Sequence, residues 1–173
     1  MKLDSSGAEE IFKEWRDALE FESGLQIKNT PVVLIKRDIF YLLYEGLSKI
    51  VGAPAITIMS FAGEGYGKEL YRDVAAECGE DRDMAIKALC NIISASGIGD
   101  IEIEVSDTDI EITVPEGLPI GKKAKGRAAD SYFVGMFSEF FSELFNKRFE
   151  GNEEECLAKG DSICRIVLKE KGV

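Results

Sequence analysis

The sequence predicts an α+β fold, in which an antiparallel sheet of two hairpins plus one further strand carries its helices on one face. Two segments, 101–114 and 148–168, alternate apolar and polar residues on either side of a turn, which is the pattern of a β-hairpin. Helical patterns precede and separate them, and the order is not the βαβαβ order of a doubly wound nucleotide-binding sheet. Hairpins joined by helices favour an α+β domain.

The N-terminal segment predicts an amphipathic helix over residues 7–21. Ser6 and Glu9 have the spacing of a capping box at its start. Its apolar side chains recur at helical spacing, at Ile11, Phe12, Trp15 and Leu19. Large apolar side chains near a terminus usually need a partner surface. We therefore predict that residues 1–24 are a dimerisation arm and that residues 25–173 form the main domain.

The next segments predict a short extended run, a helix and a strand. The extended run covers residues 31–35. Residues 38–50 predict a helix, which ends at Gly52 in the usual position for a glycine C-cap. Residues 54–61 predict a strand, because isoleucines alternate with a threonine inside that run.

A glycine cluster at residues 63–67 leads into a helix that stops at Gly79, and a further helix covers residues 82–95. A glycine-rich turn between a strand and a helix is where phosphate-binding loops occur. Here Lys68 is followed by Glu69 rather than by Ser or Thr, so the P-loop pattern fails. The favoured interpretation is close packing of the glycine backbone against a neighbouring segment.

The second half of the chain gives the clearest patterns. Isoleucine and valine alternate with glutamate and threonine in the first hairpin, which predicts one apolar face and one acidic, solvated face. A loop rich in Gly, Pro and Lys follows at residues 115–125. Residues 130–146 predict a helix with several phenylalanines on its apolar side. The second hairpin turns at Lys159-Gly160-Asp161.

Composition excludes several classes of function. The net charge is −11, which disfavours binding to nucleic acid and to anionic membranes. The chain has no histidine, so histidine-dependent catalytic triads and histidine metal sites are excluded. No apolar run has the length of a transmembrane helix, and the N-terminus has no signal-peptide core. We therefore expect a cytoplasmic protein, in which four cysteines are free thiols or metal ligands before they are disulfides.

Aromatic residues are candidates for lining an apolar cavity. The chain has ten Phe and five Tyr, many on the predicted inner faces of helices, although such stripes more often form a packed core. We predict that seven side chains converge on one apolar ligand pocket: Tyr66, Leu70, Val74, Ile103, Ile112, Val134 and Phe137.

The C-terminal hairpin carries two cysteines beside a carboxylate, and this arrangement has three interpretations. Glu153, Cys156 and Cys164 supply three zinc ligands, and Asp130 at the start of the preceding helix supplies a fourth. Two carboxylates and two thiolates form a less thiophilic site than four cysteines do. The second interpretation is two buried free thiols that act as small apolar groups. The third is a cross-strand disulfide, which a reducing compartment disfavours.

A family resemblance rests on the same residues. The stretch Tyr132-Phe133-Val134-Gly135-Met136-Phe137 precedes Glu153-x-x-Cys156 and Gly160-Asp161-x-x-Cys164. Together they resemble the 4-vinyl reductase domain, most densely from Asp130 to Leu168. The Gly-Asp turn and the cysteine spacing are the most specific parts of the resemblance.

The resemblance implies a small-molecule-binding domain, usually dimeric, whose fold is similar to that of TRAPP vesicle-tethering subunits. The family occurs in sensor regions of phenol- and xylene-responsive activators, in a bacteriochlorophyll biosynthesis protein and as stand-alone archaeal proteins. In the aromatic sensors, zinc is held by a cysteine, a glutamate and two cysteines. The last three fall on Glu153, Cys156 and Cys164, and Asp130 stands in place of the first cysteine.

The sequence therefore predicts a cytoplasmic homodimer that binds or senses a small, largely apolar ligand, aromatic or hydrocarbon-like, with a structural zinc at the C-terminal hairpin. Any signal passes to a separate signalling protein. One alternative is an enzyme that acts on a vinyl-bearing or tetrapyrrole substrate with an external reductant, although the chain has no recognisable nicotinamide or flavin motif. The other alternative is a scaffold protein similar to the TRAPP subunits.

Overall fold

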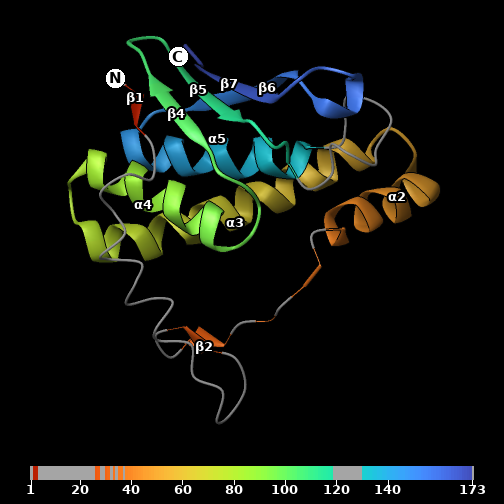
Figure 1. Ribbon diagram of the computed structural model, residues 1–173, viewed down its shortest axis with the longest axis horizontal. Helices are drawn as coiled ribbons and strands as arrows, with labels where there is room; N and C mark the ends of the chain where they lie inside the picture. The colour runs from red at the N-terminus through yellow and green to blue at the C-terminus, as the bar shows by residue number, and fades with distance from the viewer. Residues whose placement is uncertain are drawn as a thin grey trace.

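The computed structural model describes residues 2–3, 26–27, 30–31, 33, 35–36, 38–118 and 130–172. An antiparallel sheet lies above a layer of helices, and α5 runs directly beneath it (Figure 1). The helices are α2 (Ile39–Val51), α3 (Ala55–Cys78), α4 (Arg82–Ala95) and α5 (Ser131–Phe145). The predicted helix over residues 7–21 lies outside the described residues. Among the described residues, no helix is long and apolar enough to cross a membrane.

The main sheet has five strands in the order β1-β4-β5-β7-β6. Its strands are β1 (Lys2–Leu3), β4 (Glu102–Val105), β5 (Asp109–Val114), β6 (Phe149–Glu155) and β7 (Cys164–Glu170). A separate pair joins β2 (Gln26–Ile27) to β3 (Thr30–Pro31). This arrangement confirms the predicted α+β class.

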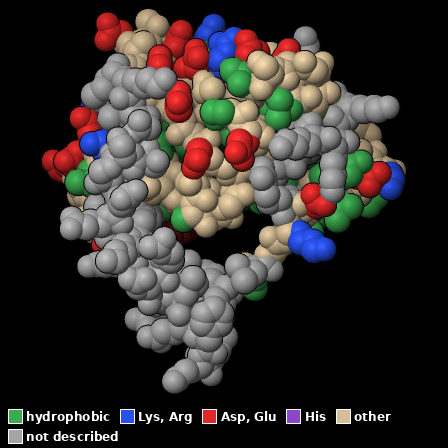
Figure 2. Space-filling view, in the orientation of Figure 1, with side chains coloured by type: hydrophobic (Ala, Val, Ile, Leu, Met, Phe, Trp, Pro, Cys, Tyr) green, Lys and Arg blue, Asp and Glu red, His purple; other side chains and the backbone are tan. Residues whose placement is uncertain are grey.

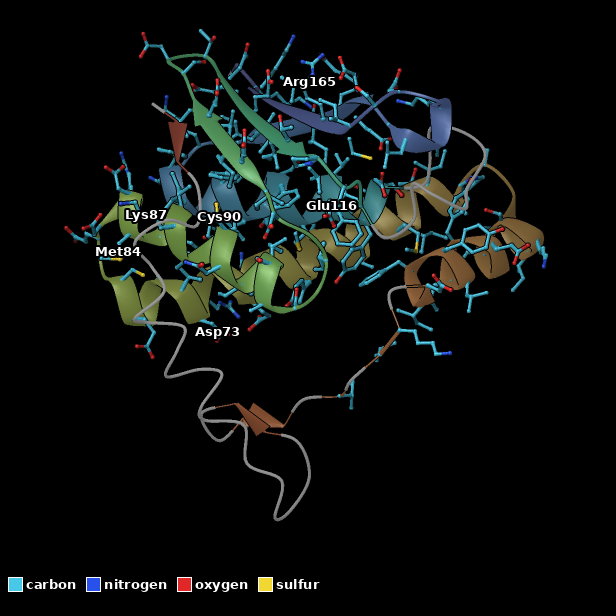
Figure 3. The ribbon with its side chains drawn as sticks, viewed as in Figure 1. Asp73, Met84, Lys87, Cys90, Glu116 and Arg165 are labelled. Carbon is cyan, nitrogen blue, oxygen red and sulfur yellow. The ribbon has the colours of Figure 1, made fainter. Side chains whose placement is uncertain are left out.

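Both predicted hairpins are present, with the apolar face turned toward the helices. Ile103 of β4 is paired with Ile112 of β5, and both side chains are fully buried. The opposite face is charged: Arg165 lies on the outer side of the sheet (Figure 3) and forms ion pairs with Glu111, Glu154 and Glu155. Acidic side chains are also prominent over the sheet side of the molecule in Figure 2.

The predicted strand over residues 54–61 is wrong, because this segment is the beginning of α3. Its alternating isoleucines, Ile56 and Ile58, are each 41% exposed and do not define a buried face. The buried positions instead recur every three or four residues: Ala55, Met59, Gly63, Gly67, Leu70 and Val74. The fifth strand of the sheet is β1, which pairs with β4.

The glycine cluster lies within α3 and serves close helix packing. A Cβ atom at Gly63 would lie 1.9 Å from the carbonyl oxygen of Tyr132, and one at Gly67 would lie 2.2 Å from that of Met136. On α5, a Cβ atom at Gly135 would lie 2.1 Å from the carbonyl oxygen of Ser60. Only glycine lets the two backbones approach this closely. The interpretation of the cluster as a packing device is therefore confirmed.

The remaining helices follow their predicted limits closely. The Asp81 side chain accepts a hydrogen bond from the Met84 N–H at 3.0 Å and caps the start of α4. Helix α5 ends at Asn146, whose backbone is left-handed with φ 52°. Four fully buried phenylalanines of α5 form the centre of the core: Phe133, Phe137, Phe140 and Phe141.

Candidate metal centre

Four potential metal ligands meet where the C-terminal hairpin contacts the start of α5. Asp130 is the N-cap residue of α5, Glu153 lies on β6, Cys156 follows β6 directly, and Cys164 begins β7. One ligand atom from each lies within 4.8 Å of the ligand atoms of the others. All four side chains are buried. The structure thus brings together the four residues that the sequence suggested for zinc.

The distances between these atoms match those in a tetrahedral zinc site. The Sγ atoms of Cys156 and Cys164 lie 3.5 and 3.6 Å from Oδ2 of Asp130, and 3.9 Å from each other. Tetrahedral zinc, with sulfur at about 2.3 Å and oxygen at about 2.0 Å, gives edges of about 3.5 Å between sulfur and oxygen and about 3.8 Å between two sulfurs. The three measured edges therefore leave room for an ion of that size.

The carboxylates of the cluster carry buried oxygens that make no hydrogen bond to a described residue. Oδ1 of Asp130 and both side-chain oxygens of Glu153 are buried and accept no hydrogen bond. Burial, followed by the neighbouring Glu153, raises the pKa of Asp130 to about 10. Orphaned carboxylate oxygens in an enclosed site are costly unless a cation or a proton satisfies them. A divalent cation would fit this need, and the oxygen and sulfur donors suit zinc.

The two thiols have pKa values shifted in opposite directions. The neighbouring Cys156 thiol, together with the backbone N–H groups of Leu157 and Leu118, lowers the pKa of Cys164 to about 6, against burial, which raises it. The same pairing, together with burial, raises the pKa of Cys156. A metal must displace any thiol proton that remains in order to bind both sulfurs.

The turn between β6 and β7 holds Cys156 in place. The C=O of Cys156 accepts hydrogen bonds from the N–H groups of Lys159 at 2.8 Å and Asp161 at 3.3 Å. The Asp161 carboxylate accepts the Cys156 N–H at 2.8 Å, and Gly160 takes the positive φ of 98° that the turn requires. The 3-10 helix η1 (Leu157–Lys159) lies within this turn.

Lys159 supplies positive charge beside the cluster. Its Nζ donates to the backbone C=O of Glu153 at 3.1 Å and lies 3.7 Å from Oε2 of the same residue. The sequence marks the Lys-Gly-Asp turn but gives no sign that Lys159 and Asp161 support the ligands. That role becomes visible only through the hydrogen bonds of the folded turn.

The remaining cysteines lie away from this cluster, and all four are free thiols. Cys78 is the last residue of α3, and Cys90 lies on α4, at the opposite end of the helical layer from η1 (Figure 3).

The seven predicted ligand-binding side chains do not all occupy one place. Five of them belong to the buried core between the helices and the sheet: Leu70, Val74, Ile103, Ile112 and Phe137. Val134 is half-buried, packs against that core and also lines a surface groove. Tyr66 is 46% exposed, and its ring stacks on Tyr132 with centroids 6.4 Å apart.

No protein-family profile and no curated protein sequence matches the chain. Several solved structures share its fold. The phenol-responsive sensory domain of the transcription activator PoxR, with phenol, has a TM-score of 0.78 at 15% identity, over 95% of this chain and 90% of that one. A trafficking protein particle complex subunit 3 from Naegleria fowleri, covalently bound to palmitic acid, has a TM-score of 0.58 at 17% identity, over 79% and 95%.

A vinyl-4-reductase family protein from Methanocaldococcus jannaschii has a TM-score of 0.51 at 18% identity, over 95% of this chain and 94% of that one. The chain shares the fold of these proteins. The fold expected from the 4-vinyl reductase resemblance is therefore confirmed, including its likeness to a TRAPP subunit.

Proposed function

We propose that this protein binds or senses a small, largely apolar ligand, aromatic or hydrocarbon-like. The observation that carries the proposal is the fold it shares, over 95% of the chain, with a sensory domain that responds to phenol. The likeness to a subunit that carries palmitic acid adds a second protein of this fold associated with an apolar molecule. The ligand would enter the core between the helices and the inner face of the sheet, next to Leu70, Ile103 and Phe137.

Thermal denaturation with phenol and with palmitic acid, each added separately, tests this proposal. A ligand that binds the folded state raises the midpoint as its concentration increases. A core variant such as Ile103→Phe, which enlarges a buried side chain paired with Ile112, should reduce the shift, whereas Ile56→Phe on the exposed face of α3 should not. The proposal fails if neither compound changes the midpoint at millimolar concentration.

The cluster of Asp130, Glu153, Cys156 and Cys164 would hold a structural zinc in this domain. Such an ion would tie the C-terminal hairpin to the start of α5, with all four positions filled by protein. The metal content of the purified protein, measured by mass spectrometry, tests this assignment directly.

The protein would act as a homodimer and pass its signal to a separate protein. Apolar side chains are exposed on α2 and on the first half of α3, and green side chains are visible over α2 in Figure 2. The largest of them are Leu42, Leu43, Ile50, Ile58 and Phe61, with exposed fractions from 41% to 82%. If these side chains form one apolar surface, that surface would be the dimer interface. Residues 1–24 would add to this interface, and sedimentation with and without them measures their share.

A TRAPP-like scaffold is the second candidate, because the same exposed helices would serve a protein that only assembles with others. It differs from a sensor in its response to ligand: it dimerises, but phenol and palmitic acid leave its stability unchanged. A vinyl reductase would instead bind a flavin or oxidise a nicotinamide in the presence of its substrate, which absorbance measures.

A further inference from the structure

A groove of about 530 Å³ runs along β6, between that strand and the helices α3 and α5. Glu64 of α3, Glu139 of α5 and Arg148, the residue before β6, all line it. Ser138 and Gly151 also line it. The groove contains none of the four candidate metal ligands, and of the seven predicted apolar ligand contacts it contains only Val134.

The backbone of β6 offers hydrogen-bonding groups to this groove. β6 is the last strand of the described sheet and pairs only with β7. The Lys171 N–H donates to the Arg148 C=O, so the backbone groups of Arg148 face β7. Along a strand of an antiparallel pair, residues whose backbone groups face the partner strand alternate with residues whose groups face away from it. The N–H and C=O groups of Phe149 and Gly151 therefore point away from β7. The Phe149 N–H is already bonded to Oγ of Ser142 at 2.9 Å. Gly151 therefore presents both of its backbone groups on the free edge.

A buried hydroxyl without a partner lies beside Gly151. Ser138 is 8% exposed, and its Oγ makes no hydrogen bond to any described residue. A Cβ atom built on Gly151 would lie 2.7 Å from that oxygen, so the two residues are in direct contact. A buried hydroxyl without a partner is costly, and a bound ligand would satisfy it.

The charges of the groove are separated and incompletely paired. Lys147 and Glu150 are neutralised by Glu170 and Lys171. Arg148 and Glu139 form no ion pair with a described residue. Burial raises the pKa of Glu64, and so does the nearby Glu139, while Arg148 and a hydrogen bond with Ser60 lower it. The two carboxylates and the guanidinium thus act on one another across the groove without a direct ion pair among the described residues.

We propose that this groove binds a small zwitterion of the α-amino-acid class, with its ammonium group between Glu64 and Glu139 and its carboxylate against Arg148 and the Gly151 N–H. The Ser138 hydroxyl donates to the same carboxylate. A simple anion would face two glutamates, and a simple cation would face Arg148, so only a molecule carrying both charges complements all three side chains. This site is separate from the apolar ligand and from the zinc of the proposed function.

Titration calorimetry of the full chain with each of the twenty standard amino acids tests the proposal. At least one amino acid should bind with a Kd of about 1 mM or below, a modest affinity for a small ligand. Its amide, which lacks the carboxylate, and its deamino acid, which lacks the ammonium group, should each bind about tenfold more weakly, because each loses a charge-assisted contact. The proposal is overturned if no amino acid binds, or if either analogue binds as well as the parent.

Two variants locate the binding. Arg148→Gln should weaken binding about tenfold, whereas Arg72→Gln, which alters an exposed arginine of α3 that pairs with Glu69, should not change it. Ser138→Ala should weaken binding severalfold, yet leave the ligand-free protein equally or more stable, because it removes an unsatisfied buried hydroxyl. Binding that survives both Arg148→Gln and Ser138→Ala would place the amino acid elsewhere and overturn this assignment. Neither result bears on phenol or palmitic acid binding, so the two proposals fail independently.

Discussion

The Sγ atom of Cys164 lies 3.6 Å from Oδ2 of Asp130, although 34 positions separate the two residues in the chain. Asp130 precedes the first turn of α5, and Cys164 begins β7, so this contact joins the helical layer to the sheet. The same carboxylate oxygen is 3.5 Å from Sγ of Cys156. One aspartate oxygen thus faces both thiols.

Zinc content should depend on the hairpin cysteines and not on the helical ones. We expect about one zinc per subunit in the wild type after refolding with excess zinc, because four protein ligands complete a structural site. Cys164→Ser should lose most of that zinc, and Cys78→Ser should retain it. Inductively coupled plasma mass spectrometry gives the ratio. Wild-type protein that holds no zinc would identify the two cysteines as core thiols.

Without metal, the protein should become less stable as pH rises from about 4. Burial raises the pKa of Asp130 to about 10 in the folded state, whereas the unfolded carboxyl keeps a pKa near its ordinary value of 3.8. The stability given by the retained proton is fully present below pH 4 and is lost progressively as pH rises toward 10, by at most about 1.4 kcal/mol per pH unit for one proton. Urea denaturation in EDTA at pH 5 and pH 8 measures the difference.

Asp130→Asn is the matched control for this pH dependence, because it keeps the shape of the side chain and removes its titration. Its stability in EDTA should change less between pH 5 and pH 8 than that of the wild type. With zinc present, the wild-type protein should instead become more stable as pH rises, because protons compete with the metal for the thiolates at low pH. An equal pH dependence in wild type and variant would exclude Asp130 as the source.

Replacing Asp130 with a sulfur ligand should strengthen metal binding. Asp130→Cys replaces an oxygen donor with a thiolate at a buried position of similar size, and thiolates suit zinc better than carboxylates in structural sites. We expect zinc to bind about tenfold more tightly or better, a change of about 1.4 kcal/mol. Co²⁺ titration provides the readout, since an added sulfur intensifies the sulfur-to-metal absorption. The control Asp161→Cys changes a residue that holds the turn and should give no such gain.

Much of this fold can be predicted from the sequence, because in most elements the periodic apolar positions are also the buried ones. The hairpin of β4 and β5 alternates apolar and acidic residues, and its apolar positions are the buried ones. The beginning of α3 misleads for a physical reason: Ile56 and Ile58 alternate on an exposed surface. Its true buried stripe includes glycines such as Gly63, which a hydrophobic pattern does not register.

The candidate metal site, too, can be predicted only in part from the sequence. Cys156 and Cys164 stand out by their spacing around a turn, and Glu153 precedes them by a few residues, so the sequence places these three together. Asp130 joins them only through the packing of α5 against the hairpin. The groove along β6 has no sequence signal, because Ser138 and Gly151 come from different elements and meet only when β6 lies on α5.

Close contact between α3 and α5 should make Gly63 and Gly67 intolerant of any side chain. In Gly63→Ala the new Cβ would overlap the backbone carbonyl of Tyr132, and backbone cannot move aside as a side chain can. We expect a loss of about 3 kcal/mol or more in the free energy of unfolding, at the upper end of the range for overpacked cores.

Gly65→Ala is the matched control on the same helix, because nothing lies within 4 Å of its Cβ position. It should stabilise the protein by up to about 1 kcal/mol, because alanine favours helix over glycine. Urea denaturation of the two variants measures both effects, and similar stabilities for the two would show that the helices are not held in backbone contact.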